Sequence, residues 1–212
     1  MMLGGEGTIE DENPVWVDFA HGLAPLMMPF AEIIAHAVGA GPARVLDVAA
    51  GLGMFGIQIA VQNPKAQVAA LDWPAVLAVA AEKAEKFGVA NRWTGIPGSA
   101  LSVDYVTGFD VVLLTNFLHH FDQAYCVDIL RRVHASLKPG GRAIMLESVP
   151  KPDRVTPPSS AAFRMTMMLN TSAGDAYALS QYEAMFGAAG FESTQLAPNG
   201  ELPEQILVSI RR

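Results

Sequence analysis

The segment 45–56 constrains the fold of this chain more than any other stretch. An apolar run of strand type ends in Asp47-Val48, a loop of small residues follows, and a helical pattern then begins. Small residues let the backbone approach a ligand closely, and a helix start presents amide groups to it. Asp72 closes the next apolar run, 67–71, at about the spacing of a ribose-binding carboxylate. We therefore predict a nucleoside-binding β-α-β unit.

The glycine pattern alone does not identify the nucleoside. Gly51, Gly53 and Gly56 fit the G-x-G-x-x-G spacing of a dinucleotide site. A carboxylate at the mouth of the first strand, as at Asp47, is poorly placed beside a pyrophosphate but suits a ligand with an ammonium and a sulfonium group. A tight structural turn without a ligand is the simpler alternative, and the acid at position 72 argues against it.

Composition sets wider bounds. A chain of 212 residues with 51% hydrophobic content is predicted to form one domain with a substantial core. The net charge of −7, with no basic cluster longer than two arginines, argues against nucleic acid as a partner. The single Cys126 excludes an internal disulfide and fits a reducing cytoplasm, and we expect it in the core of a helix rather than in catalysis. We expect no signal peptide and no apolar span of membrane length that is free of breakers.

Three regions are expected along the chain. Residues 1–12 are rich in glycine and acids and are expected to be mobile. Residues 13–40 are apolar at helical spacing, with Pro25 and Pro29 expected to break them into two or three helices. Residues 41–212 alternate strand and helix signals, which predicts an α/β, Rossmann-like, doubly wound and mostly parallel sheet.

Strands are predicted at 43–48, 67–72, 92–95, 110–115 and 142–147, and helices at 54–62, 75–87 and 123–137. Lys138-Pro139-Gly140-Gly141 is interpreted as a helix stop and turn. The proline-rich stretch 151–158 should leave the sheet, and a Met-rich helix should follow at 161–170. Ser180 to Glu183 is interpreted as a capping box that opens another helix, and strands at about 192–196 and 205–210 close the chain.

The loop resembles motif I of class I S-adenosylmethionine-dependent methyltransferases, an acid followed by glycines at alternate positions. The first glycine of that motif is Ala49 here, which is small enough if its φ is negative. Later segments resemble small-molecule O-methyltransferases of the plant caffeate and bacterial polyketide type. These segments are Asp72 to Val76, Asn116 to Asp122, Leu137 to Arg142 followed by Glu147, and Ala188 to Phe191, together with Glu12 to Pro14 and Met27 to Phe30.

The resemblance covers nearly all of residues 12–210 and implies the class I methyltransferase fold with N-terminal helices. Residues 41–212 would then be the cofactor-binding catalytic domain, with S-adenosyl-L-methionine as cofactor and a small, aromatic hydroxyl compound as substrate. Full-length family members carry an N-terminal dimerisation domain, so this chain is expected to be an excised domain or a short member. We expect a monomer or weak homodimer, and a dimer if such a domain exists.

The resemblance implies a catalytic pair, His119 as base and Glu147 as its partner. A phenol has a pKa near 10, so an imidazole of pKa about 6–7 can help remove its proton as the methyl group transfers. His119 follows the fourth predicted strand and Glu147 ends the fifth, so their side chains can meet at the same sheet edge, where the glutamate fixes the imidazole tautomer. His120 is the alternative base, and either histidine could instead cap the helix that opens at Asp122.

The implied cofactor site uses Asp47, Ala49, Gly51 and Gly53 for methionine and ribose, Asp72 for the ribose hydroxyls and Trp73 for adenine, unless this tryptophan is ordinary core. Ser99, followed by Ala100, stands where the family has an acid, and Thr115 where a basic residue is common. A second helper acid of the family falls near Ala176. The helix over the substrate would contribute Phe163, Met165, Met168 and Asn170, although a Met stripe can be plain core. No metal is expected.

Two rival functions stay open. Ala49, Ser99 and Ala176 favour a weakly binding or non-catalytic member of the fold. A nicotinamide-dependent oxidoreductase fits the glycine spacing, but Asp47 and the segment 118–122 argue against it. Methylation at carbon or nitrogen is a further alternative.

Overall fold

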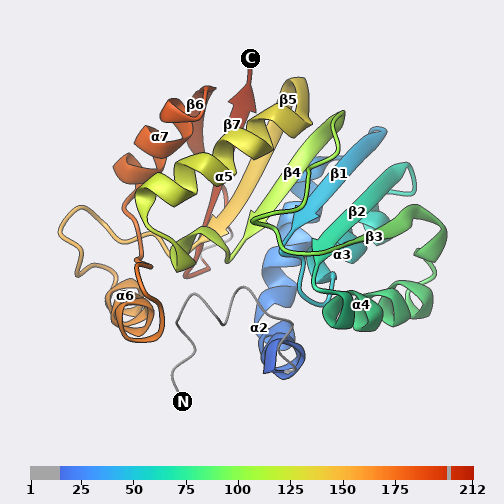
Figure 1. Ribbon diagram of the computed structural model, residues 1–212, viewed down its shortest axis with the longest axis horizontal. Coiled ribbons are helices and arrows are strands. Elements are labelled where there is room, and N and C mark those ends of the chain that lie inside the picture. Colours follow the sequence, from blue (N-terminus) through green and yellow to red (C-terminus); the bar gives the residue numbers. More distant parts are fainter. Residues whose placement is uncertain (1–14, 200–201) are drawn as a thin grey trace. The chain divides into compact units, whose positions relative to one another are not determined.

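The computed structural model describes residues 15–199 and 202–212, so the predicted mobility of residues 1–12 lies outside the described part. Seven strands are hydrogen-bonded in the order β3-β2-β1-β4-β5-β7-β6 (Figure 1). The chain divides into two compact units on either side of the Leu113–Leu114 bond, and each is described in turn. The mostly parallel α/β sheet predicted from the sequence is confirmed.

The N-terminal unit is a β-α-β-α-β arrangement. Its elements are α2 (Val15–Val38), β1 (Ala43–Val48), α3 (Met54–Gln62), β2 (Ala66–Asp72), α4 (Pro74–Lys86), the 3₁₀ turn η1 (Ala90–Arg92), β3 (Trp93–Pro97) and most of β4 (Phe109–Thr115). Strands β1, β2 and β3 are parallel, with Asp47 opposite Ala70 and Asp72 opposite Pro97. These bounds agree with the predicted strands and helices of this region to within two residues.

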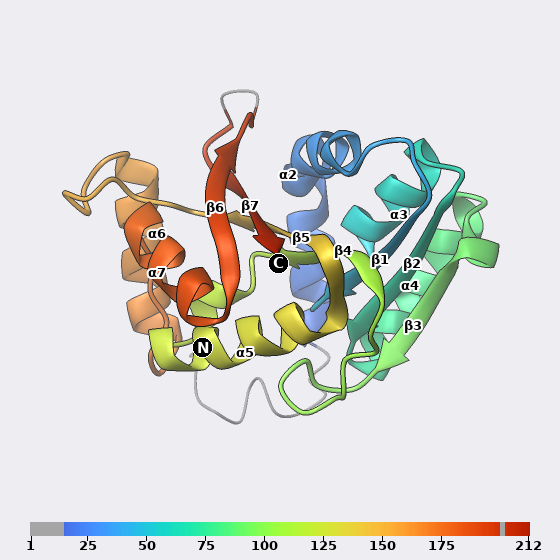
Figure 2. The same cartoon turned by 90° about the horizontal axis from the view of Figure 1, so that it is seen from above.

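The prediction that Pro25 and Pro29 break the N-terminal segment was wrong, because α2 runs as one helix from Val15 to Val38. An interior proline removes one hydrogen bond and bends a helix without having to end it. Figure 2 shows α2 changing direction along its length. Its apolar face, including the fully buried Ile34, packs on α3, and this burial outweighs the local cost of the prolines.

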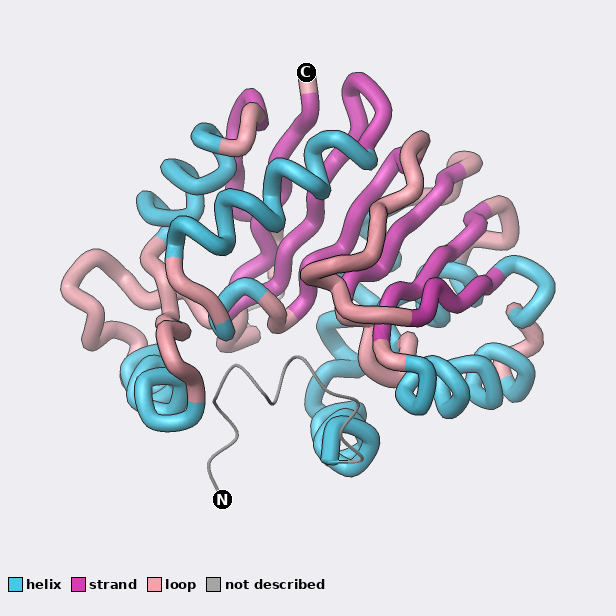
Figure 3. The backbone as a smooth tube through the Cα atoms, viewed as in Figure 1, coloured by secondary structure: helices cyan, strands magenta, loops and turns pink. Residues whose placement is uncertain are grey.

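The C-terminal unit contains η2 (Leu118–His120), α5 (Gln123–Ser136), β5 (Leu137–Glu147), α6 (Pro158–Asn170), α7 (Leu179–Ala188), β6 (Phe191–Ala197) and β7 (Gln205–Arg211). Strand β7 is antiparallel to both β5 and β6. The predicted excursion after β5 is a long loop that leads to α6, drawn in pink in Figure 3. Helices α5 and α7 contact each other, and α7 packs on β6, where the fully buried Phe186 meets the Phe191 ring.

Two local predictions in this unit were wrong. Residues 138–141 were interpreted as a turn, but β5 already begins at Leu137 and runs through them. The glycines permit this, since Gly140 takes a φ of 75° inside the extended segment. The capping box was placed at Ser180 and Glu183, whereas α7 begins one residue earlier and the Gln181 side chain accepts the Ala178 N–H at 3.0 Å.

No helix in the described part of the chain is long and apolar enough to cross a membrane.

Candidate active site

In the N-terminal unit, a buried carboxylate lies under the glycine-rich loop. Asp47 is fully buried, and its Oδ2 accepts the Gly56 N–H at 3.0 Å. A side chain on residue 56 would clash, because its Cβ would lie 2.7 Å from Val68 and 3.1 Å from the same carboxylate oxygen. The other oxygen, Oδ1, is buried without a hydrogen-bond partner among the described residues. The site thus offers one unused acceptor for a cationic or hydrogen-bonding ligand.

The second acid holds the loop from the neighbouring strand. Asp72 accepts the Gly51 N–H through Oδ2 at 2.8 Å and the Trp73 N–H through Oδ1 at 2.7 Å. Burial raises the pKa of Asp72 to about 6, while these two backbone hydrogen bonds oppose the rise. The carboxylate therefore links the end of β2 to the loop after β1, and each oxygen retains lone pairs for further donors.

The loop backbone answers the question raised by Ala49. The φ of Ala49 is +53° and not the negative value that an alanine prefers. A left-handed conformation costs an alanine about 1–2 kcal/mol relative to its preferred region. Gly51 and Gly53 are left-handed too, with φ of 55° and 70°, and Gly53 precedes the first turn of α3. The loop therefore has the backbone shape expected of a ligand-binding loop, and Ala49 is strained in it.

The remaining predicted cofactor residues lie at strand ends or just after them. Trp73 is half-buried and immediately precedes α4. Ser99 uses its hydroxyl to accept the Leu101 N–H at 3.2 Å, and the Ala100 carbonyl accepts the Tyr105 hydroxyl at 2.9 Å. Thr115, which ends β4, is buried and belongs to the C-terminal unit. Their assignment to a cofactor stays a prediction.

Replacing Asp47 by asparagine should stabilise the empty protein at pH 8. Burial, opposed by the Gly56 hydrogen bond and augmented by the charge of Asp72, raises the pKa of Asp47 to about 8 from 3.8. Between these values the folded protein holds a proton that the unfolded chain has lost, so the free energy of unfolding falls as pH rises through this window. Asparagine does not ionise, so the variant avoids this loss. Its free energy of unfolding should exceed that of the wild type by a difference that grows from pH 4 to pH 8 and reaches a few kcal/mol. Urea unfolding across this pH range measures it, and a constant difference would contradict the burial of an ionisable proton at this site.

In the C-terminal unit, a buried histidine contacts a buried glutamate. His119 Nδ1 lies 2.7 Å from Glu147 Oε2, and both side chains are almost inaccessible to solvent. The other glutamate oxygen accepts the N–H groups of Phe117 and Leu118 at 3.1 and 2.9 Å. The carboxylate therefore fixes both the imidazole and the backbone that carries it. With Nδ1 engaged as a donor, Nε2 is the nitrogen that can accept a proton.

The neighbouring histidine is a poor base. Burial, together with the charge of His119, lowers the pKa of His120 to about 3. Its ring centroid lies 4.4 Å from that of His119. Neither histidine caps α5, since Asp122 Oδ1 accepts the Tyr125 N–H at 2.8 Å. Cys126 is buried in α5, as predicted, with its thiol 3.2 Å from the Leu118 carbonyl.

Of the four residues predicted on the substrate side of α6, one contacts the histidine. The Phe163 ring meets the His119 ring edge-on at a centroid distance of 4.8 Å. Met165 and Met168 are 63% and 58% exposed, and the Asn170 amide donates to the Thr166 carbonyl of its own helix. The plain-core reading of the Met stripe is therefore wrong for these two methionines, while a substrate role for them stays a prediction.

A further carboxyl group near the His119–Glu147 pair was not predicted from the sequence. Glu204 immediately precedes β7, whose first residue, Gln205, is opposite Glu147. Burial and the charge of Glu147 raise the pKa of Glu204 to about 7, opposed by the charge of His119 and by a hydrogen bond from the Asn116 side chain. One of its carboxylate oxygens is buried without a partner in the described residues. No sequence motif marks this position, since only the antiparallel register of β5 and β7 brings it there.

Within the described ranges, no group of three or more His, Cys, Asp or Glu side chains is placed to hold a metal ion.

A parallel β-α-β unit with a carboxylate-anchored glycine loop is typical of nucleoside-binding α/β proteins, and a buried histidine–glutamate pair is an arrangement that can support acid–base chemistry. Comparison with known sequences identifies the family. The O-methyltransferase domain family matches residues 17–192, and the chain belongs to it.

Acetylserotonin O-methyltransferase of Gallus gallus is 26% identical over 164 residues, which cover 77% of this chain and 46% of that protein. Demethylspheroidene O-methyltransferase of Rhodobacter capsulatus is 32% identical over 151 residues, covering 70% of this chain and 36% of that protein. This chain therefore spans less than half the length of both curated relatives.

Among solved structures, a protein of Nostoc punctiforme described as a candidate O-methyltransferase is 44% identical, with a TM-score of 0.93. The match covers 98% of this chain and 64% of that one. Human N-acetylserotonin methyltransferase in complex with S-adenosylmethionine, at 20% identity and a TM-score of 0.80, shares the fold over 92% of this chain and 55% of its own.

Proposed function

We propose that this chain is the catalytic part of an S-adenosylmethionine-dependent O-methyltransferase that acts on a small aromatic hydroxyl compound. The observation that carries the proposal is the buried contact of 2.7 Å between His119 Nδ1 and Glu147 Oε2. A nucleoside-binding domain does not need a histidine held in one tautomer, whereas removing a proton from a hydroxyl group does.

The N-terminal unit fits the cofactor on three observations. The unused oxygen of Asp47 suits the ammonium of a methionine moiety, the left-handed loop at Gly51 and Gly53 admits close backbone approach, and Asp72 suits ribose hydroxyls. S-adenosylmethionine, when bound, supplies an electrophilic methyl group on a sulfonium. The protein then has to position an acceptor in line with it, which is the main source of acceleration for such a displacement.

The C-terminal unit supplies the acid–base chemistry. His119 takes the proton of the acceptor hydroxyl on Nε2 while Nδ1 donates to Glu147. The carboxylate stabilises the imidazolium that forms, and its second oxygen keeps the segment 117–118 in place. Phe163 packs against the imidazole edge and helps to exclude water from it.

The names of two relatives guide the choice of acceptor. One is a 3-hydroxy-5-methyl-1-naphthoate 3-O-methyltransferase and another is a 3-amino-4-hydroxybenzoate 4-O-methyltransferase, at 28% and 29% identity. Both names place the methylated oxygen on an aromatic ring. A third relative is an L-tyrosine C(3)-methyltransferase at 26% identity, so carbon methylation is the second candidate.

Calorimetry with S-adenosylhomocysteine, followed by turnover of phenols and catechols with labelled cofactor, tests the proposal. We expect saturable binding of S-adenosylhomocysteine, no heat with NAD, and label transferred to oxygen. Binding of NAD would favour the oxidoreductase alternative, and absence of binding to either would favour a non-catalytic member. The monomer or weak homodimer expected from the sequence stays a prediction that light scattering decides.

A further inference from the structure

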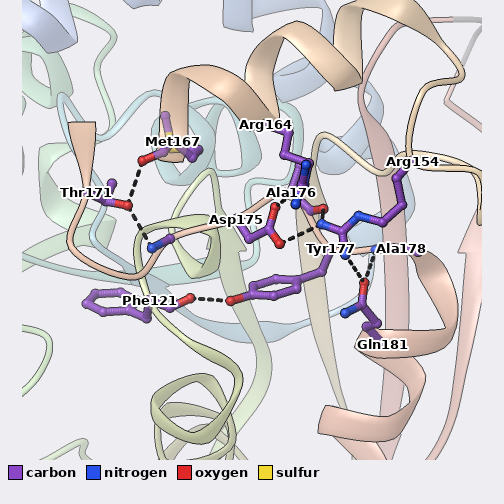
Figure 4. Close-up of polar contacts among 11 residues, drawn as sticks. Phe121, Arg154, Arg164, Met167, Thr171, Asp175, Ala176, Tyr177, Ala178 and Gln181 are labelled. Atoms are coloured by element: carbon purple, nitrogen blue, oxygen red, sulfur yellow. Dashed lines mark hydrogen bonds and ion pairs between the residues drawn. The ribbon is translucent and has the colours of Figure 1, made fainter. Parts of the chain in front are cut away.

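The segment 174–177, which follows α6, lies against the turn that carries the catalytic histidine. The Asp175 N–H donates to the His119 carbonyl at 3.0 Å. Figure 4 shows a second contact, in which the Tyr177 hydroxyl donates to the Phe121 carbonyl at 2.6 Å. Gly174 packs so tightly that a Cβ there would clash with the His119 carbonyl oxygen. We call residues 174–177 the strap.

An ion cluster fastens the strap. Arg154 Nη2 lies 2.5 Å from Asp175 Oδ2, and Arg164 Nε lies 2.9 Å from Asp175 Oδ1 (Figure 4). Arg154 comes from the loop after β5, where its φ is +60°, and Arg164 comes from α6. One carboxylate thus joins the two segments that flank the candidate substrate side. All three side chains are two-thirds or more buried, so solvent screens the cluster only in part.

Further bonds attach both ends of the strap. At its start, the Thr171 hydroxyl donates to the Met167 carbonyl of α6 at 2.8 Å and accepts the Gly174 N–H at 2.7 Å. At its end, Arg154 donates to the Ala176 carbonyl at 3.3 Å and to Gln181 Oε1 at 3.4 Å. The strap is therefore held at every residue, which is more than a surface connection between two helices needs.

We propose that Asp175 is a positioning residue for the catalytic base. Held by Arg154 and Arg164, Asp175 keeps the strap in contact with the backbone of the 118–121 turn. This contact sets where the His119 imidazole lies. Glu147 holds the ring and the amides of 117 and 118, and the strap holds the carbonyls of 119 and 121. Because Phe163 touches the imidazole from α6, the cluster also fixes the spacing between this helix and the base. The proposal rests on the proposed function of His119.

Two kinds of substitution test the strap. Asp175→Asn keeps the shape and the backbone donor but removes the charge, and Asp128→Asn, in the exposed Arg131–Asp128 pair, is its control. Gly174→Ala forces the strap away from the His119 carbonyl, and Gly187→Ala, with nothing within 4 Å of its Cβ, is its control. We expect each strap variant to lower kcat roughly tenfold or more at unchanged cofactor affinity, because displacing a reacting group by about 1 Å can cost up to a hundredfold. Both controls should match the wild type.

A readout independent of turnover is the ring-proton resonance of His119, assigned by its loss in His119→Ala and compared between variants at one pH. The groups near this ring are Glu147, His120, Glu204 and Phe163, and none of them is changed in the variants. Asp175→Asn and Gly174→Ala should shift this resonance, while the controls should not. Normal resonances and kcat in a variant that only melts earlier would overturn the proposal.

Substitutions of the two arginines test the proposal even if a strap variant does not fold. Arg164 bonds Asp175 through a single nitrogen, so Arg164→Lys should retain near-normal kcat, whereas Arg164→Met should not. Arg154 serves three acceptors at once, so Arg154→Lys should be the more damaging lysine substitution. If all three arginine variants behave alike, Asp175 does not act through the cluster. If the wild type itself transfers no methyl group, the proposed function fails, yet the resonance of His119 still reports on the strap.

Discussion

Replacing His119 by alanine should lower kcat for methyl transfer by about a hundredfold or more, since that is the usual contribution of a positioned general base. The loss belongs to the chemical step, so the affinity for S-adenosylhomocysteine should not change. Radiometric turnover with saturating cofactor, paired with calorimetry, measures both quantities. The imidazole is buried and its Nδ1 lies 2.7 Å from Glu147 Oε2, so alanine removes the group that this carboxylate holds in place.

The neighbouring histidine is the natural control. His120 has its pKa lowered to about 3 by burial and by His119, and His120→Ala should therefore cost far less. Glu147→Gln should also lower kcat, because an amide group facing Nδ1 favours the wrong tautomer. Equal losses in the two histidine variants, or a larger loss at position 120, would show that the base has been assigned to the wrong ring.

The pattern of the N-terminal unit was predictable because its determinants are local. Strand β1, the small-residue loop and helix α3 follow one another within twenty residues, and each carries its own signal in hydrophobic period or residue size. The pairing of His119 with Glu147 was predictable for a different reason. His119 follows β4 and Glu147 ends β5, and the carboxyl ends of parallel strands lie at the same edge of a sheet.

Contacts that depend on tertiary packing could not be predicted in the same way. Helix α2 continues past Pro25 and Pro29 because its buried face packs on α3, which no local propensity reports. The φ of +53° at Ala49 is imposed by the loop and opposes the preference of the residue.

Asp175 illustrates the same limit at the site. The sequence shows only that Asp175 is an acid next to Ala176, near which the second helper acid of the family is expected. Its role becomes visible only when Arg154, Arg164 and the His119 carbonyl meet it in space. Glu204 is comparable, since it comes near His119 and Glu147 only through the register of two antiparallel strands.

Asp72→Ala should weaken binding of S-adenosylhomocysteine by on the order of 2–4 kcal/mol, which is roughly 30- to 1,000-fold in Kd. The substitution removes two charge-assisted hydrogen bonds expected to the ribose and also frees the Gly51 N–H that the carboxylate now accepts. Asp72→Asn separates the two effects, because the amide oxygen can still anchor the loop but carries no charge. Exposed Asp104→Ala is the control and should leave the affinity unchanged.

The pH dependence of the same titration gives a sharper test of the assignment. Burial raises the pKa of Asp72 to about 6 and that of Asp47 to about 8. If the ionised carboxylates bind the ribose and the ammonium, affinity should rise as pH increases through about 6 and rise again through about 8. Asp72→Asn should abolish the lower step, and Asp47→Asn the upper one. A wild-type affinity that is constant from pH 5 to pH 9 would mean that neither carboxylate contacts the cofactor in its charged form, and an affinity unchanged by Asp72→Ala would overturn the ribose assignment of Asp72.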